Sequence, residues 1–354
     1  MKPVLNIGVI GCGSIVQTMH LPYIWQLPYF RLNAICDISQ SVVDNVGNQY
    51  NVKHRYTNYQ ELIKQPDLDA IFVATHEHAE PAIAALNAGK HVLVEKPIAF
   101  NLSLADQMIQ AAKENKRKLM VAYNRRFDPS FEWSLTQFRN MVNPKLIRVH
   151  DFGGSFAQID EMYETYSRSD VPREMIDAAK SKSKSEAIAA IGQNNEHLAN
   201  IYLSLVLLCS HDANILHEAF GPPKRILHVD IFDNWFVLAL LEYANGARCV
   251  WETGLLMGLR DWDQQISAYS DQKNIDVKFK RPWIKNMPTE VIIKEMEDDV
   301  LVNKKVTPTL DEAFKREWQH FYECIVNDQE PITSGEKARN DIEFLINLIK
   351  ASQN

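Results

Sequence analysis

Two residues have reactive side chains and sequence surroundings that would direct these side chains toward a ligand. Lys96 follows an apolar run, His91–Val94, and precedes Pro97, so its backbone is constrained where a buried strand ends. A lysine held there can hydrogen-bond a substrate hydroxyl and take part in proton transfer. His211 stands in a polar island among leucines, and an imidazole titrates near neutrality, which suits it to accept an alcohol proton. A surface loop lysine and a purely structural core histidine are the alternatives.

A glycine-containing run near the start of the sequence predicts a phosphate-binding turn. Leu5–Ile15 reads L-N-I-G-V-I-G-C-G-S-I, an apolar stretch typical of a buried parallel strand, followed by Gly11 and Gly13. A strand, a glycine turn and a helix N-terminus are what a dinucleotide pyrophosphate requires. Val16 takes the third position of G-x-G-x-x-G, where a glycine would allow the closest packing of helix on strand. On these residues alone, an ordinary strand–turn–helix remains open.

Asp37 strengthens the dinucleotide interpretation. It ends the next apolar run, Arg31–Cys36, and lies 24 residues after Gly13. An acidic side chain at that distance can accept both ribose hydroxyls of an adenosine, and its charge would repel a 2′-phosphate. The sequence therefore predicts NAD, with NADP as the less favoured cofactor. An exposed turn aspartate is the alternative.

Strands and helices alternate up to about residue 124 and predict a doubly wound parallel sheet. Ligands bind at the carboxyl ends of such strands, which here are Gly11–Ser14, Asp37, Thr75–His78, Glu95–Pro97 and Tyr123–Phe127. From residue 125 the pattern becomes α+β, with a mostly antiparallel open sheet. We predict a dinucleotide-binding domain over 1–124 and a substrate-binding and oligomerisation domain over 125–354. Its final helix is expected near the first domain.

Composition narrows the function classes. The net charge of −7 and the pI near 5.9 argue against a nucleic-acid partner. No apolar stretch approaches the roughly 18–20 residues that span a membrane, and the first residues do not resemble a secretion signal. Five scattered cysteines, mostly inside apolar segments, indicate buried thiols in a reducing cytoplasm.

Two other kinds of site find little support. His76 and His78 form one H-x-H pair without further carboxylates in order, which is a weak metal signal, so we predict no metal. A serine nucleophile is disfavoured because no G-x-S-x-G turn is present.

Four motifs together resemble the Gfo/Idh/MocA oxidoreductases over nearly the whole sequence. They are G-C-G-S-I-V-Q-T-M-H-L-P at Gly11–Pro22, E-K-P at Glu95–Pro97, Y-N-R-R-F-D-P at Tyr123–Pro129 and S-H-D-x-N-x-L at Ser210–Leu216. The resemblance implies an N-terminal Rossmann domain and hydride transfer between NAD(P) and a secondary alcohol of a sugar, glycoside or cyclitol. It also implies a homodimer or homotetramer formed through the C-terminal sheet.

The resemblance also assigns residues. It places Lys96 and His211 in the catalytic step and, with Asn124 and Arg126, beside the substrate. The residues expected to line the cofactor are Gly11, Gly13, Ser14, Ile15, Asp37, Thr75, His78, Glu95, Lys96 and Arg125.

One departure from the family pattern leaves other functions open. Many members carry an aspartate four residues before the histidine, and Leu207 stands there in this sequence. A catalytically silent NAD-binding sensor is one alternative. Another is an enzyme that uses transiently reduced, bound NAD for elimination or epimerisation. The long stretch 157–194, with Tyr163, Tyr166 and Arg168, is expected to cover the substrate or to form a subunit contact.

Overall fold

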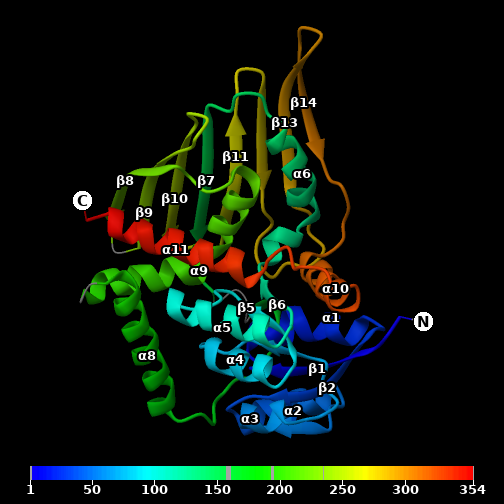
Figure 1. The fold of residues 1–354 in the computed structure, drawn as a ribbon. Helices are drawn as coiled ribbons and strands as arrows, with labels where there is room; N and C mark the ends of the chain where they lie inside the picture. Colours follow the sequence, from blue (N-terminus) through cyan, green and yellow to red (C-terminus); the bar gives the residue numbers. More distant parts are fainter. Residues whose placement is uncertain (1, 157–160, 193–194, 234, 354) are drawn as a thin grey trace. The chain divides into compact units, whose positions relative to one another are not determined.

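The computed structural model describes residues 2–156, 161–192, 195–233 and 235–353, which form two compact units (Figure 1). The N-terminal unit comprises Met1–Tyr123, Met162–Asn194 and Phe314–Ile342. The C-terminal unit comprises Asn124–Glu161, Asn195–Ala313 and Glu343–Asn354. The main change of unit falls where the sequence pattern changes, but two later segments return to the N-terminal unit. The sequence pattern predicted only the final helix near the first domain, and the start of that helix, up to Ile342, belongs to the second of these segments.

The N-terminal unit is built on a six-stranded parallel sheet in the order β3-β2-β1-β4-β5-β6. The change of direction after β1 confirms the predicted doubly wound sheet. Its strands are β1 (Leu5–Ile10), β2 (Phe30–Cys36), β3 (His54–Tyr56), β4 (Ala70–Val73), β5 (His91–Glu95) and β6 (Leu119–Ala122).

Capping residues mark the ends of the helices that connect the strands of this sheet. Ser39, Asn58 and Asn101 each accept a hydrogen bond from a first-turn amide of the helix that follows. Gly89 adopts a φ of +74° just after α4 ends, a conformation that glycine tolerates best. These helices are α2 (Gln40–Gln49), α3 (Tyr59–Ile63), α4 (Ala79–Asn87) and α5 (Leu102–Glu114).

The helix after the glycine turn begins as a short π-helix, η1 (Val16–His20), and continues as α1 (Leu21–Gln26). Val16, at the third glycine position, is fully buried. The departure from G-x-G-x-x-G is therefore accommodated inside the core of the unit.

Segments from later in the sequence complete the N-terminal unit. They supply α8 (Arg173–Ile191), nearly all of α10 (Ala313–Val326) and α11 (Gly335–Ala351) as far as Ile342. Trp318 of α10 is fully buried, with its ring 5.4 Å from that of Phe72.

The C-terminal unit contains an eight-stranded sheet in the order β14-β13-β12-β11-β7-β10-β9-β8. Only its β7–β10 pair is parallel, which confirms the predicted mostly antiparallel sheet. Asn245 and Gly246 turn the chain between β9 and β10, and an Asn-Gly pair is a strong hairpin signal in the sequence. The strands are β7 (Leu146–Gly153), β8 (Arg225–Phe232), β9 (Phe236–Glu242), β10 (Arg248–Leu255), β11 (Trp262–Tyr269), β12 (Lys273–Lys278), β13 (Glu290–Glu297) and β14 (Val300–Val306).

Helices α6 (Pro129–Arg139) and α9 (Glu196–Phe220) belong to this unit, with the short 3₁₀ turn η2 (Asn124–Phe127) and the part of α11 that follows Ile342. Over 18 residues of α9 the mean hydropathy reaches 1.2, enough by length and composition for a membrane span. However, 67% of that window is buried in the structure, as in the core helix of a globular protein. We therefore treat α9 as a core helix.

The five cysteines are all buried and free, as the sequence predicted.

Candidate functional site

The turn after β1 has the geometry of a phosphate cradle. Gly11 adopts a φ of +92°, and a Cβ there would lie 2.5 Å from the carbonyl oxygen of Ala74, so no other residue fits. At Gly13 a Cβ would come within 4 Å only of the Arg168 guanidinium, so no backbone crowds this position. The loop therefore permits a pyrophosphate to approach the main chain, and its residues fit a dinucleotide.

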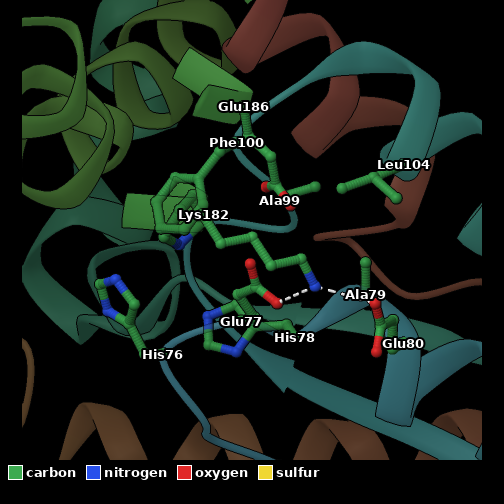
Figure 2. Close-up of a pocket in the computed structure, with 11 residues that line it drawn as sticks. His76, Glu77, His78, Ala79, Glu80, Ala99, Phe100, Leu104, Lys182 and Glu186 are labelled. Carbon is green, nitrogen blue, oxygen red and sulfur yellow. Dashed lines mark hydrogen bonds and ion pairs between the residues drawn. The ribbon is translucent and has the colours of Figure 1, made fainter. Parts of the chain in front are cut away.

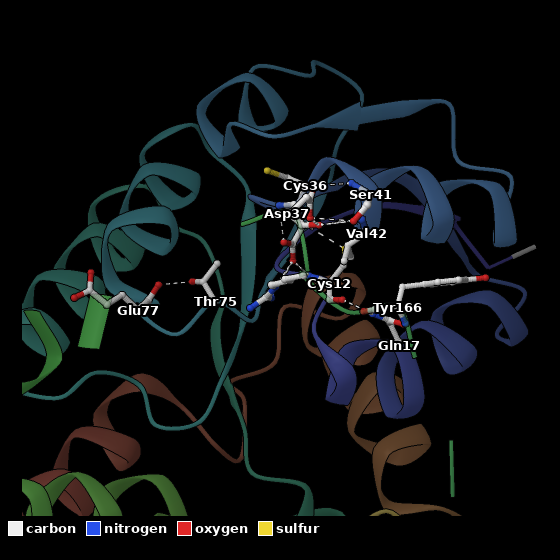
Figure 3. Close-up of polar contacts among 12 residues, drawn as sticks. Cys12, Gln17, Cys36, Asp37, Ser41, Val42, Thr75, Glu77 and Tyr166 are labelled. Carbon is white, nitrogen blue, oxygen red and sulfur yellow. Dashed lines mark hydrogen bonds and ion pairs between the residues drawn. The ribbon is translucent and has the colours of Figure 1, made fainter. Parts of the chain in front are cut away.

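Asp37 lies directly beside this turn, as predicted. Its Oδ2 accepts a hydrogen bond from the Cys12 amide at 2.7 Å, and its Oδ1 accepts one from the Ser39 amide at 3.0 Å. Arg168 also donates to Oδ2, from Nη2 at 2.9 Å and from Nε at 3.2 Å. Figure 3 shows Asp37 between the glycine turn and the start of α2. The sequence placed Asp37 correctly but did not predict Arg168 as its partner.

Glu95, at the end of β5, lies in a buried hydrogen-bonded chain that fixes the E-K-P loop. Its Oε2 accepts a hydrogen bond from the Lys96 amide at 3.0 Å, and its Oε1 lies 2.8 Å from Nε2 of His20. Trp318 Nε1 donates to Nδ1 of His20 at 3.1 Å, which leaves Nε2 to donate to Glu95.

Neighbouring residues lower the pKa of Glu95. Burial disfavours its charge, but the hydrogen bond from His20 and the charge of Lys96 outweigh burial and hold its pKa below the usual value. The carboxylate thus stays available to hold the loop that carries Lys96. The Lys96–Pro97 peptide is cis.

A second carboxyl, Glu317 of α10, is fully buried in the same unit, and neither of its oxygens has a hydrogen-bond partner. Burial, with the nearby charge of Glu95, raises its pKa well above the usual value. Neither Glu317 nor His20 was singled out from the sequence. Glu317 lies in an ordinary amphipathic helix, and the only sign of His20 was its place in the glycine motif.

The Thr75–His78 loop after β4 bends back on itself, because the Thr75 hydroxyl donates to the carbonyl of Glu77. His78 is buried, and burial lowers its pKa to about 4, so it is neutral near pH 7. His76 instead forms a 2.9 Å hydrogen bond with Ser183 of α8. Among the described residues, no three histidine, cysteine or acidic side chains gather as a metal site would require.

A cavity of about 140 Å³ lies between this loop, α5 and α8 (Figure 2). Lys182 of α8 forms ion pairs with Glu77 and Glu80 at its wall. Burial, with the charge of Glu77, raises the pKa of Glu186 to about 7. The residues lining the cavity are His76, Glu77, His78, Ala79, Glu80, Pro97, Ala99, Phe100, Leu104, Lys182 and Glu186.

In the C-terminal unit, half-buried His211 is followed by Asp212, which is fully buried in α9. Asp212 Oδ1 accepts a hydrogen bond from Gln264 Nε2 at 2.6 Å. Asp151 of β7 and Asp212 act on each other electrostatically, and burial raises the pKa of both carboxyls, to about 7 for Asp212. No acidic residue stands in the helical turn before His211, where Leu207 takes the position of the aspartate found in many family members.

The two predicted arginines of the Y-N-R-R-F-D-P motif are buried in the C-terminal unit. Arg125 lies over the ring of Phe279, at 5.1 Å from its centroid, and donates to the Lys280 carbonyl at 3.2 Å. Arg126 forms an ion pair with Glu218 at 3.0 Å. Asn124 opens η2 beside them. The cofactor role predicted for Arg125 and the substrate roles predicted for Asn124 and Arg126 stay predictions.

The structure therefore gathers most of the predicted cofactor residues within the N-terminal unit. Gly11, Gly13 and Asp37 meet at the carboxyl ends of β1 and β2, and Ser14 approaches Thr165 at 3.5 Å. Ile15 immediately precedes η1. Lys96 belongs to this unit, and His211 belongs to the other.

Comparison with known proteins agrees with this geometry. Residues 5–123 match the model of an oxidoreductase family with an NAD-binding Rossmann fold, Gfo/Idh/MocA. These residues belong to that family. The match confirms the resemblance over these residues, which contain the motifs Gly11–Pro22 and Glu95–Pro97.

Relatives and solved structures extend the comparison. Myo-inositol 2-dehydrogenase of Thermotoga maritima is 36% identical over 130 residues, 36% of this chain and 39% of the relative. The NADP-dependent scyllo-inositol 2-dehydrogenase of Bacillus subtilis is 31% identical over 139 residues, 39% of this chain and 41% of the relative. The matched stretch thus spans about two-fifths of either relative.

A solved aldose–aldose oxidoreductase from Caulobacter crescentus superimposes with a TM-score of 0.75 at 18% identity, over 99% of this chain and 98% of that one. The two chains therefore share a fold through both units.

Proposed function

We propose that this chain is a dehydrogenase that transfers a hydride between NAD and a secondary alcohol or ketone of a sugar, glycoside or cyclitol. The observation that carries the proposal is the glycine cradle of Gly11 and Gly13, with Asp37 beside it and E-K-P at the end of β5 in the same unit. The family match and the inositol dehydrogenases among the relatives support the substrate class.

The bound cofactor would supply the hydride acceptor, and the protein would supply the proton chemistry. In the oxidation direction, Lys96 would donate a hydrogen bond to the reacting oxygen and stabilise negative charge developing on it. An imidazole nitrogen of His211 would accept the hydroxyl proton as the carbonyl forms. Glu95, held by His20, would position Lys96 by accepting the hydrogen bond from its amide.

NAD is the proposed cofactor because Asp37 ends β2. Its carboxylate can accept the two ribose hydroxyls and would repel a 2′-phosphate. The amides of Cys12 and Ser39 already orient this carboxylate.

We further propose that the protein is cytoplasmic and forms a homodimer or homotetramer through the C-terminal sheet. Five free, buried thiols are typical of a reducing compartment. Exposed apolar side chains on the sheet, including Leu238, Val300 and Leu301, support an association surface there.

The first experiment is an assay of NADH formation by near-ultraviolet absorbance against a panel of inositols, aldoses and glycosides, with NADP in parallel. Turnover of any of them with NAD preferred supports the proposal. Tight NAD binding by calorimetry without turnover would favour a sensor, or an enzyme that recycles its bound cofactor. The absence of NAD and NADP binding would contradict the proposal.

A further inference from the structure

The segment Thr165–Asp170 lies on the glycine turn of its own N-terminal unit. Gln17, just after the turn, holds Tyr166 by both backbone groups. Its Oε1 accepts from the Tyr166 amide at 2.8 Å, and its Nε2 donates to the Tyr166 carbonyl at 3.0 Å (Figure 3). The same Nε2 donates to the Cys12 carbonyl at 2.7 Å. One side chain therefore joins the segment to the phosphate cradle.

Arg168 saturates the carboxylate oxygen that a ribose would need. A carboxylate oxygen accepts about two hydrogen bonds. Oδ2 of Asp37 already accepts one from the Cys12 amide and others from the Arg168 guanidinium. The Asp37 side chain is only 1% exposed in this arrangement, whereas that of Arg168 is 38% exposed. A ribose that uses both oxygens of Asp37 must displace the guanidinium.

Asp170 makes a parallel contact at the start of α2. It accepts hydrogen bonds from the Ser39 hydroxyl, from the Ser41 amide at 3.1 Å and from the Ser41 hydroxyl at 3.0 Å. The hydrogen bonds from Ser39 and Ser41 lower the pKa of Asp170 to about 2, so its carboxylate is charged near neutrality. After β2, Arg168 thus binds Asp37, and Asp170 binds Ser39 and Ser41.

We propose that Arg168 and Asp170 set the affinity of this chain for its dinucleotide, because they occupy in cis the adenosine-ribose position beside Asp37 and leave it when the dinucleotide binds. The inference rests on the proposed function. It assigns to the inserted stretch a role toward the cofactor that neither the family match nor the relatives assign. A dinucleotide binds only the fraction of molecules in which the segment has left, so its apparent affinity falls by that fraction.

The test compares the full-length protein with Arg168→Gln and Asp170→Asn by calorimetric titration with NAD and NADP. If the segment is seated in about 90% of molecules, releasing it tightens NAD binding by about 10-fold. We expect that gain in Arg168→Gln and a smaller one in Asp170→Asn. Arg173→Gln is the matched control, because Arg173 is exposed and pairs only locally with Asp177 in the contacts described. It should bind NAD like the wild type.

Weaker or unchanged NAD binding in Arg168→Gln would overturn the inference and leave the proposed function intact. If neither the wild type nor Arg168→Gln binds NAD or NADP, the proposed function itself fails and the inference fails with it. The two failures are therefore distinguishable.

Limited trypsin cleavage after Arg168, located by mass spectrometry, distinguishes a segment that leaves when NAD binds from one that closes over NAD. NAD changes the cleavage rate in opposite directions in the two cases. If the segment leaves on binding, NAD accelerates cleavage there, and Asp37→Asn accelerates it without any ligand. Slower cleavage with NAD would mean that Arg168 closes over the cofactor, and would overturn the inference.

Discussion

Asp37 of the N-terminal unit and Asp212 of the C-terminal unit are both buried aspartates beside residues proposed to function, but their neighbours differ in kind. Asp37 faces donors: two backbone amides and the guanidinium of Arg168. Asp212 faces one amide donor, from Gln264, and another carboxyl, from Asp151. The first environment supplies hydrogen-bond donors to the carboxylate, whereas burial in the second raises the pKa of Asp212. The two aspartates therefore differ in their surroundings, which suits ligand binding at Asp37 and proton handling at Asp212.

Removing the proposed catalytic side chains should have the largest effect on activity and should separate the roles of the two units. Lys96→Ala and His211→Ala should each lower kcat/KM by about 10²–10⁴-fold, the range for a lost acid, base or polarising group. His211→Ala should leave the calorimetric affinity for NAD unchanged, because the glycine cradle belongs to the other unit. His197→Ala, exposed on the same helix, is the control. Full turnover in both catalytic variants would contradict the assignment.

Arg125 tests how much the acidic pair of the C-terminal unit depends on a cation. The charges of Asp128, Asp151, Asp212 and Glu312 all act on this buried guanidinium. Arg125→Met should lower the free energy of unfolding by about 3–5 kcal/mol, because it removes a buried cation that interacts with several buried acids. Urea unfolding measures the loss. Arg148→Met, which removes an exposed ion pair with Glu252, should cost less than about 1 kcal/mol. Equal losses of unfolding free energy in the two variants would contradict a special role for Arg125.

Asp212→Asn tests how the raised pKa of Asp212 affects the stability of the fold. Since burial raises the pKa of Asp212 to about 7, the folded state binds a proton that the unfolded state releases near pH 4. Stability from this group is present below about pH 4 and is lost as the pH rises to 7. The variant should therefore gain about 1–3 kcal/mol relative to the wild type between pH 5 and pH 8. Thermal unfolding as a function of pH measures the difference, and an identical pH dependence in both proteins would contradict the raised pKa of Asp212.

Glu317→Gln gives the smallest expected effect and applies the same logic to the N-terminal unit. The pKa of Glu317 is raised by burial, and both of its oxygens are without partners, so its ionisation opposes folding above its unfolded pKa. The variant should be more stable than the wild type by about 1 kcal/mol at pH 8, with little difference at pH 4. A loss of stability at pH 8 would show that the charged form has a favourable role in this unit.

The sequence predicted the parallel sheet, and the residues at its carboxyl edge, because local signals determine where the strands end. The glycine turn, Asp37 and Glu95 each stand at the end of a buried strand, and parallel topology brings such ends to one edge. The prediction failed where long-range packing decides. Helix α8 has only three buried side chains among its 19 residues, so no apolar periodicity marked it within the stretch 157–194.

Tertiary contacts also decide the partners of the site residues. Arg168 was expected to cover the substrate, and its contact with Asp37 joins residues 131 positions apart. Asp151 lies in a strand of alternating burial, and nothing in that alternation shows that its neighbour is another acid. Strand β14 was missed because its exposed apolar and charged residues resemble a loop.

The late return of α10 has a consequence for how this protein is made. The rings of Phe72 and Phe30 each lie 5.4 Å from that of Trp318, which follows them by 246 and 288 positions in the chain. During synthesis, the first 123 residues emerge with this aromatic surface uncovered and must wait for most of the remaining chain before it can be buried. The first sheet to leave the ribosome is thus among the last parts to reach its final stability, and over that interval chaperones have the most apolar surface to protect.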